Sequence, residues 1–473
     1  MIQFFQLEIV LASVVLSACS LAATLPASPE NPTPLTTMTR TLTVVKRTLT
    51  ATPMVTHSQT AMPKVTQQLT HTSSTHTLPS LTPTEETFLV TTRLNYQDLA
   101  NGQYLVVSRN VGVAGKPYGE TDLFLMNAKG LFEEFAIIYK TGLSAALTSD
   151  GKKLAFTYLE NSHNQVAIFD FLKNTYSELP NAGNCIELTW SPVGHQIAMG
   201  RCETGITVIS IDTGEYYTVT RQDPLAVWHE NMPAWSPDGQ QIAYFQGPTF
   251  HSSPVSSCGI SSDGIYVIDN PGEDKVTWNN QRALLIDDCL YGPLAWSPDS
   301  QTIAIQFGEQ RSLLSLQIYQ PWTGLRRTLV NEKGVNRVAW SPDGQQIAFN
   351  DWDGNLYLIS PDGAEPVLID SSGNLDVVSW IKKLTFDPGD IMSITPAGHD
   401  LNLRDAPSLA GASLRKLQPG DTVTLLEGPV EADGYTWWKM STEDGLEGWA
   451  VEVAVWYDAV SDAGNGGVTT PTP

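Results

Sequence analysis

The chain has 473 residues, of which 16% are charged, and its 50 acidic residues outnumber 27 basic ones to give a formal net charge of −23. Such a length exceeds one small core and predicts two or three folded units of about 100 to 200 residues each. The negative charge repels phosphate backbones and argues against nucleic acid as a partner.

The N-terminal segment is an apolar run, FFQLEIVLASVVLSAC, about as long as the core of a signal peptide and short for a membrane span. Its end, LSAC at residues 16–19, resembles the bacterial lipobox, although no Lys or Arg precedes the run and Glu8 lies within it. The resemblance implies that residues 1–19 are a lipoprotein signal peptide and that Cys19 carries a lipid. We therefore expect an extracytoplasmic protein anchored to the bacterial cell membrane, with a freely secreted protein as the alternative.

Residues 20–86 are rich in Thr, Pro and Ser, as in HTSSTHTLPSLTPTEE, and no apolar period persists along them. This composition predicts a disordered linker that spaces a folded domain from the membrane. The last residues, 459–473, are predicted to be a disordered tail.

A repeated sequence motif recurs through the middle of the chain. AWSPDGQQIAYF begins at Ala234 and AWSPDGQQIAFN at Ala339, with relatives LTWSPVGHQIAMG, LAWSPDSQTIAIQ and LTSDGKKLAF. Pro, Asp and Gly suit successive positions of a tight turn, so SPDG indicates a hairpin between two short strands. Ser300 replaces the glycine of one copy and should cost about 1 kcal/mol in a left-handed conformation.

The spacing of these hairpins indicates a β-propeller. Their serines, aligned at 149, 191, 236, 297 and 341, are separated by 42, 45, 61 and 44 residues, and such periods are typical of four-stranded blades. Apolar residues on successive positions, as in QQIAF, require both faces of each strand to be covered, which stacked blades provide.

A sixth blade is predicted from both ends of the repeat region. LDVVSW, ending at Trp380, looks like an innermost strand without partners, and GQYLVVSR, DLFLMN and LFEEFAII near residues 102–138 look like the missing outer strands. The repeat pattern resembles the WD40-like β-propeller repeat of the TolB family over residues 98–384. The resemblance implies a six-bladed ring, but it says little about function, because one fold can serve many functions.

Residues 392–458 have a different sequence pattern, which predicts short strands separated by PGD, ADG and EDG turns. LNLR at residues 401–404 with the following Pro407, then Gly420–Asp421, Trp438 and Gly448–Trp449, resembles the bacterial SH3-like domain. The fold class is thus all-β: a disordered stalk, a six-bladed propeller and a small SH3-like barrel. The second resemblance implies a module that binds cell-wall peptides or other extracellular ligands.

Aromatic residues are dense in this module, and a candidate groove consists of Tyr435, Trp437, Trp438 and Trp449. Alternation along a strand places Trp437 and Trp438 on opposite faces, so we expect at most one of them in the core. Packing of these rings inside the barrel is the alternative to a peptide groove.

The sequence offers little catalytic chemistry. It has no G-x-S-x-G elbow and no H-E-x-x-H motif, and its eight histidines are scattered. We therefore expect no enzymatic activity, no cofactor and no metal site, and a monomer that binds a cell-wall peptide or an envelope protein. The alternative is a propeller-based hydrolase acting on glycans, which needs two buried carboxylates about 5 to 9 Å apart at the mouth of the ring.

Four cysteines follow Cys19, at positions 185, 202, 258 and 289, and an even number in an exported chain favours two disulfides. Cys185 and Cys202 flank one hairpin, which favours that pair and leaves Cys258 with Cys289, although other connectivities stay open. The sulfurs of the first pair share a face if Trp190 pairs with His195, whereas a bulge would separate them.

Strand order also predicts a binding face on the propeller. If the SPDG turns lie on one rim, the long loops emerge on the other, and rigid rings commonly present ligand contacts on such loops. The candidate residues are Tyr118, Trp228, His229, Phe250 and His251. Idle surface loops are the alternative.

Overall fold

The structure of the protein is a computed structural model. It describes residues 90–112, 119–127, 130, 132–160, 163–179, 182, 185, 187–200, 202, 205–220, 228–248, 264–269, 281–286, 290–308 and 313–460. Cys19, the predicted stalk and residues 461–473 lie outside these ranges, and the predictions for them are untested. No helix among the described residues is long and apolar enough to cross a membrane.

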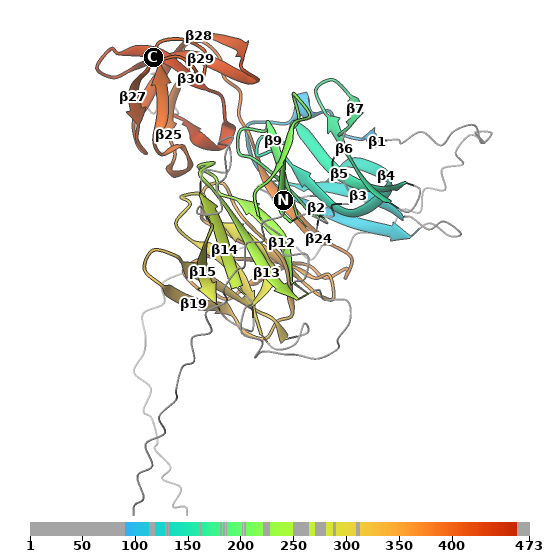
Figure 1. The fold of residues 1–473 in the computed structure, drawn as a ribbon. Coiled ribbons are helices and arrows are strands. Elements are labelled where there is room, and N and C mark those ends of the chain that lie inside the picture. Colours follow the sequence, from blue (N-terminus) through green and yellow to red (C-terminus); the bar gives the residue numbers. More distant parts are fainter. Residues whose placement is uncertain are drawn as a thin grey trace, which may run out of the picture. The chain divides into compact units, whose positions relative to one another are not determined.

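Six four-stranded blades form the larger part of the structure, as the repeat predicts (Figure 1). Four of them are separate antiparallel sheets. Their strands are β8 (Glu187–Trp190), β9 (Gln196–Gly200), β10 (Thr207–Ser210) and β11 (Tyr216–Thr218); β12 (Trp228–Trp235), β13 (Gln241–Pro248), β14 (Gly264–Asp269) and β15 (Gln281–Ile286); β16 (Leu290–Trp296), β17 (Ile303–Phe307), β18 (Ser315–Gln320) and β19 (Leu325–Val330); and β20 (Val335–Trp340), β21 (Ile347–Asp351), β22 (Leu356–Ile359) and β23 (Val367–Asp370).

The other two blades share one eight-stranded sheet. Its strands are β24 (Asp376–Lys383), β2 (Gly102–Gly112), β3 (Gly119–Met126), β4 (Phe132–Leu147), β5 (Lys153–Glu160), β6 (His163–Asp170) and β7 (Thr175–Glu178), with β1 (Val90–Thr92) paired to β4. Strand β24 pairs with β2, from Gly102 opposite Lys383 to Ser108 opposite Asp376 (Figure 1). The sixth blade is therefore stitched from both ends of the repeat region, which confirms the prediction.

Two features of this sheet are absent from the sequence analysis. Strand β4 serves two blades, because residues 132–141 pair with β3 and residues 141–147 pair with β5. Strand β1 and the short 3-10 helix η1 (Tyr96–Asp98) precede the first predicted strand, and Tyr96 is only 1% exposed in the core of these blades.

Apolar residues on successive positions are explained by the stacking of blades. In β17, Ile303 and Ile305 pack with residues of the preceding blade, and Ala304 packs with residues of the following one. All three side chains are completely buried. Each central strand is thus covered on both faces by neighbouring blades, as expected.

The SPDG segments form the predicted hairpin turns. In one copy the Ser341 hydroxyl donates to Asp343 Oδ1 (2.6 Å), and Ser341 Oγ accepts from the backbone N–H of Gln346 (2.9 Å). Ser300 adopts the left-handed φ of 55° that its glycine-like position requires, and its hydroxyl accepts from the backbone N–H of Asp238 in the adjacent blade (3.2 Å).

The alignment of the first repeat needs a correction. In LTSDG the hydroxyl that bonds the aspartate belongs to Thr148, which donates to Asp150 Oδ1 (2.6 Å) and accepts from the backbone N–H of Lys153 (3.0 Å). Thr148, and not Ser149, is therefore the equivalent of Ser191. Serine and threonine are interchangeable here because the turn uses only the hydroxyl.

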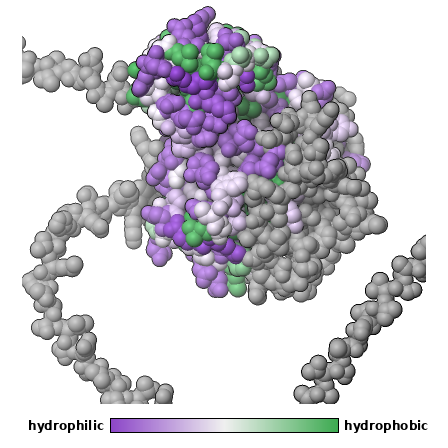
Figure 2. Space-filling model, turned by 60° about the vertical axis from the view of Figure 1, so that its left-hand side comes forward, coloured by the Kyte–Doolittle hydropathy of each residue, from purple (hydrophilic) through white to green (hydrophobic). Residues whose placement is uncertain are grey.

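The C-terminal module is a seven-stranded antiparallel sheet in the order β27-β26-β30-β29-β28-β25-β31, which curves into the predicted SH3-like barrel (Figure 1). Its elements are β25 (Ile391–Ile394), η4 (Pro396–Gly398), β26 (Leu401–Arg404), β27 (Ser413–Leu417), β28 (Thr422–Ala432), β29 (Tyr435–Thr442), β30 (Glu447–Val451), η5 (Ala454–Trp456) and β31 (Tyr457–Ala459). On the face shown in Figure 2, the described residues are mostly hydrophilic and the hydrophobic patches are small.

Candidate ligand-binding cleft

The SH3-like module packs against the SPDG turns of the propeller. Val193, which stands where other repeats have Asp, joins the hydrophobic cluster of the SH3-like module that contains Trp437. His195, two residues further along, contacts the ring of Tyr435 with ring centroids 4.4 Å apart. Its Nδ1 is hydrogen-bonded to Asp212 Oδ2 (2.8 Å). The departure from the repeat at Val193 is therefore a docking contact, and it was the sequence signal that could have located this junction.

Polar contacts extend the junction on both sides of Val193. The Trp456 indole donates to the Pro237 carbonyl (2.9 Å), and Lys152 Nζ bonds Glu452 Oε1 (2.8 Å). Although burial disfavours the Lys152 cation, the nearby carboxylates of Asp150 and Glu452 outweigh it and raise the pKa of Lys152. Lys152 therefore stays charged within the junction across ordinary pH.

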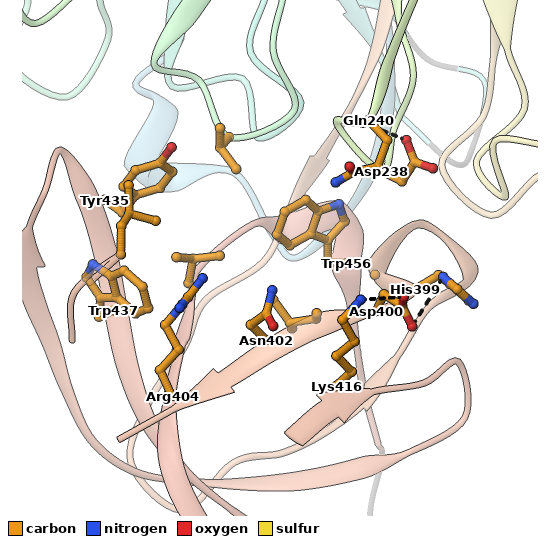
Figure 3. Close-up of a pocket in the computed structure, with 15 residues that line it drawn as sticks. Asp238, Gln240, His399, Asp400, Asn402, Arg404, Lys416, Tyr435, Trp437 and Trp456 are labelled. Atoms are coloured by element: carbon orange, nitrogen blue, oxygen red, sulfur yellow. Dashed lines mark hydrogen bonds and ion pairs between the residues drawn. The ribbon is translucent and has the colours of Figure 1, made fainter. Parts of the chain in front are cut away.

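A cleft of about 470 Å³ opens beside these contacts. Strand β26 supplies Asn402 and Arg404 at its base, and the turn between β12 and β13 supplies Asp238 and Gln240 opposite them (Figure 3). Tyr435 and Trp437 lie at one end, and His399, Asp400 and Lys416 lie at the other, with Trp456 between the two modules (Figure 3).

The cleft carries charges of both signs. Lys416 Nζ pairs with Asp400 Oδ2 (2.8 Å), and hydrogen bonds from Gln418 and Lys416 lower the pKa of Asp400. Arg404 uses Nη1 to bond the Gly411 carbonyl (2.7 Å), which fixes the guanidinium and leaves other donors for a ligand. Aromatic walls together with both cationic and anionic groups fit a short peptide better than a polyanion.

The four aromatic residues of the predicted groove are divided between two faces. Tyr435 and Trp437 line the cleft, whereas Trp438 lies on the barrel side, stacks on Phe386 and donates to Glu452 Oε2 (2.8 Å). Trp449 is at the edge of the core and does not line this cleft.

The expectation that at most one of the adjacent tryptophans is buried is wrong. Trp437 is 1% exposed and Trp438 3% exposed. Both faces of β29 are covered at this point, because Val193 of the propeller belongs to the same cluster and the segment with Leu384 and Phe386 packs on the Trp438 side. Trp437 therefore offers a ligand only an edge, and Tyr435 is the more accessible ring.

Cys185 and Cys202 are joined by a disulfide in the structure. Trp190 pairs with Ile197, and not with His195, and Glu187 pairs with Gly200. Continuing this register places Cys185 directly opposite Cys202, because a shift of two residues preserves the face on which each side chain lies. Cys258 and Cys289 lie outside the described residues.

The predicted propeller face is described only in part. Tyr118, Phe250 and His251 lie outside the described residues. Trp228 and His229 belong to strand β12 and pair with Pro248 and Gly247, so they are not in the loop that the sequence predicted. Strand pairing continues past an irregularity between Asn231 and Ala234, where Met232 has a φ of 55°. Both residues lie at the end of β12 remote from the SPDG turn, and their role stays a prediction.

Two family descriptions match parts of the chain. Residues 399–455 match "Bacterial SH3 domain", and residues 324–360 match "WD domain, G-beta repeat". The chain thus combines a six-bladed propeller, one repeat of which matches the WD description, with a C-terminal module that matches the bacterial SH3 description. The search of curated proteins finds no match.

Several solved structures are similar to parts of this chain at low identity. TolB from Acinetobacter baumannii is 18% identical over 59% of this chain and 67% of that one, with a TM-score of 0.44. The Nidogen/Laminin complex matches at 12% identity over 60% and 99% of the chains (TM-score 0.45), and an oligogalacturonate lyase in complex with manganese at 14% over 73% and 84% (TM-score 0.37).

Proposed function

We propose that this chain is a lipid-anchored, extracytoplasmic binding protein that holds a cell-wall peptide in the cleft between its SH3 domain and the SPDG turns. The observation that supports this most directly is the lining of the cleft. Arg404 and Lys416 can meet a peptide carboxylate, Asp238 and Asp400 can meet an amine, and Tyr435 offers an apolar surface. Short peptides with free side-chain amines and carboxylates present this combination.

Binding should be measured by calorimetry with the purified full-length protein and soluble muropeptides. We expect Arg404→Gln to weaken binding about tenfold or more, because a hydrogen bond to a charged group contributes about 1.5 to 3 kcal/mol. Arg415→Gln is the matched control, since Arg415 lies on the neighbouring strand and pairs with Asp444 (2.7 Å) away from the cleft. Equal affinities of the wild type and both variants, or no binding of muropeptides, would rule out this ligand.

The anchor requires a separate measurement, because Cys19 lies outside the described residues. Growth with labelled palmitate should label the wild-type protein and leave Cys19→Ala unlabelled. Label that persists in the variant would eliminate the lipoprotein assignment and leave the secreted alternative.

A further inference from the structure

The aspartate position of the SPDG turn has a different environment in each of the three turns that adjoin the SH3 domain. In the first turn, Asp150 Oδ2 pairs with Lys152 Nζ (3.2 Å). In the second turn the position is occupied by Val193, which packs in the hydrophobic cluster of the SH3 domain. In the third turn, Asp238 lines the cleft between the two modules and forms no ion pair with the described residues. The third turn therefore presents an unpaired carboxylate to the cleft.

Asp238 is held in place by one of its two carboxylate oxygens. Oδ1 accepts from the Ser236 hydroxyl (2.6 Å) and from the backbone N–H of Gln240 (3.0 Å), whereas Oδ2 forms no hydrogen bond with the described residues. The turn is also fixed against the SH3 domain, because the Trp456 indole donates to the neighbouring Pro237 carbonyl (2.9 Å). A ligand that bonds Oδ2 therefore meets a carboxylate that is already ordered, which lowers the entropic cost of binding.

The other carboxylate of the cleft is already engaged. Asp400 accepts from Gln418 Nε2 at Oδ1 (2.7 Å) and from Lys416 Nζ at Oδ2 (2.8 Å). Among the described residues that line the cleft, Asp238 is thus the carboxylate with a free oxygen. Figure 3 shows it across the cleft from Arg404, which keeps guanidinium donors for a ligand.

A half-buried carboxylate with one free oxygen favours a cationic donor. An ammonium group supplies both a positive charge and N–H donors, and charge-assisted hydrogen bonds are about twice as strong as neutral ones. Acylation of the amine removes the charge, so the resulting amide gains much less from Asp238. Because Arg404 lies opposite, the two groups suit a ligand with an amine toward the propeller and a carboxylate toward the SH3 domain.

Building on the proposed function, we propose that Asp238 makes the cleft selective for cell-wall peptides whose side-chain amine is free. The SH3 domain supplies Arg404 and the aromatic surface of Tyr435, and the propeller turn supplies the selectivity. A peptide whose amine has been converted to an amide, as in a cross-link between two peptides, binds more weakly. The protein thus distinguishes unlinked from linked peptides by a single charge.

Calorimetry with the full-length protein and two synthetic peptides tests this selectivity. Both contain alanine, γ-linked glutamate and lysine with an acetylated α-amine, and they differ only in that the lysine side chain is free in one and acetylated in the other. We expect the wild type to bind the free amine at least about fivefold more tightly. Asp238→Asn keeps the Oδ1 acceptor of the turn and loses the charge, so it should bring the two affinities within about twofold of each other by weakening binding of the free amine.

Asp343→Asn is the matched control. Asp343 accepts the same two bonds, from the Ser341 hydroxyl (2.6 Å) and the backbone N–H of Gln345 (3.0 Å), but it does not line the cleft. This variant should leave both affinities within about twofold of the wild-type values. Asp400→Asn keeps the test open should Asp238→Asn fold poorly: it should preserve the preference for the free amine, because both oxygens of Asp400 are already engaged.

The outcomes separate the selectivity from the proposed function. Equal affinities of the two peptides for the wild type would overturn the selectivity and leave peptide binding in the cleft standing. A preference that survives Asp238→Asn, or that is lost in Asp343→Asn or Asp400→Asn, would overturn the role of Asp238. No binding of either peptide would overturn the proposed function and the selectivity together.

Discussion

Restoring the consensus aspartate at position 193 should loosen the SH3 domain from the propeller. In an isolated turn, Val193→Asp would be favourable, because the new carboxylate could accept from Ser191 as Asp343 accepts from Ser341 (2.6 Å). Such a bond is worth about 0.5 to 1.5 kcal/mol. The sign of the measured effect therefore distinguishes a free turn from a docked one.

The structure predicts a net loss. Val193 is partly buried in the cluster of the SH3 domain, so about half of the 1.5 to 3 kcal/mol for a fully buried valine is lost. Placing a carboxylate in that contact adds a desolvation cost of about 1 to 3 kcal/mol. After the turn bond is credited, docking should weaken by about 1 to 3 kcal/mol, which raises the undocked population roughly tenfold or more.

Exchange of the Trp456 indole proton measures this population, because that proton bonds the Pro237 carbonyl across the junction. In protein labelled with ¹⁵N-tryptophan, Val193→Asp should speed its exchange roughly tenfold. Asp343→Val is the control: it removes the turn bonds of a copy whose aspartate is exposed, and it should lower thermal stability by about 1 kcal/mol without changing this exchange. Slower or unchanged Trp456 exchange, with a raised melting temperature, in Val193→Asp would refute the docking argument.

Three further predictions use the same protein. Gly434→Ala should also speed Trp456 exchange, because Gly434 has a φ of +78° and an added Cβ would lie 2.8 Å from Asp212 Oδ2. Gly445→Ala is the control, because Gly445 has a φ of +83° but open space around the added Cβ, so this variant should show backbone strain without faster Trp456 exchange. Equal exchange rates in the two variants would contradict the contact. Reduction of the Cys185–Cys202 disulfide, which spans 17 residues, should lower the free energy of unfolding by about 3 kcal/mol, and an unchanged denaturant midpoint with reductant would show otherwise. Burial raises the pKa of Tyr457 above its usual value, so the folded chain keeps a proton that the unfolded chain releases, and the resulting stability is full below about pH 10 and is lost as the pH rises further. In Tyr457→Phe, which also loses a hydrogen bond to Val451, the free energy of unfolding should fall less steeply between about pH 10 and 12. An identical pH slope in the variant and the wild type would count against this reasoning.

The propeller could be predicted because each blade repeats its own local chemistry. The turn at Ser341 needs only residues within a few positions, and the five hairpins together with the unpaired strand at Trp380 indicate six blades. The stitched blade followed from the unpaired strand at Trp380. The shared strand β4 was not evident, since its two halves read as separate apolar segments.

The cleft could not be predicted, because it depends on contacts between modules distant in sequence. The sequence shows Val193 as a departure from the repeat, but the neighbouring residues in the sequence do not indicate which part of the protein covers it. Alternation placed Trp437 and Trp438 on opposite faces, yet burial of both depends on the propeller turn and on the segment around Phe386. Asn402 and Arg404 belonged to the SH3 pattern and acquired a cleft only through their position opposite Asp238.

The sixteen-residue strand β4 connects two blades covalently without an intervening turn. Its first half pairs with β3 and its second half pairs with β5, so the two blades share one strand. Because β24 completes the same sheet from the far end of the propeller, a nascent chain cannot finish this unit until residue 383 has been made. The ring therefore has a late-closing seam, and strands β2 to β4 must avoid pairing elsewhere until the last strand has been synthesised.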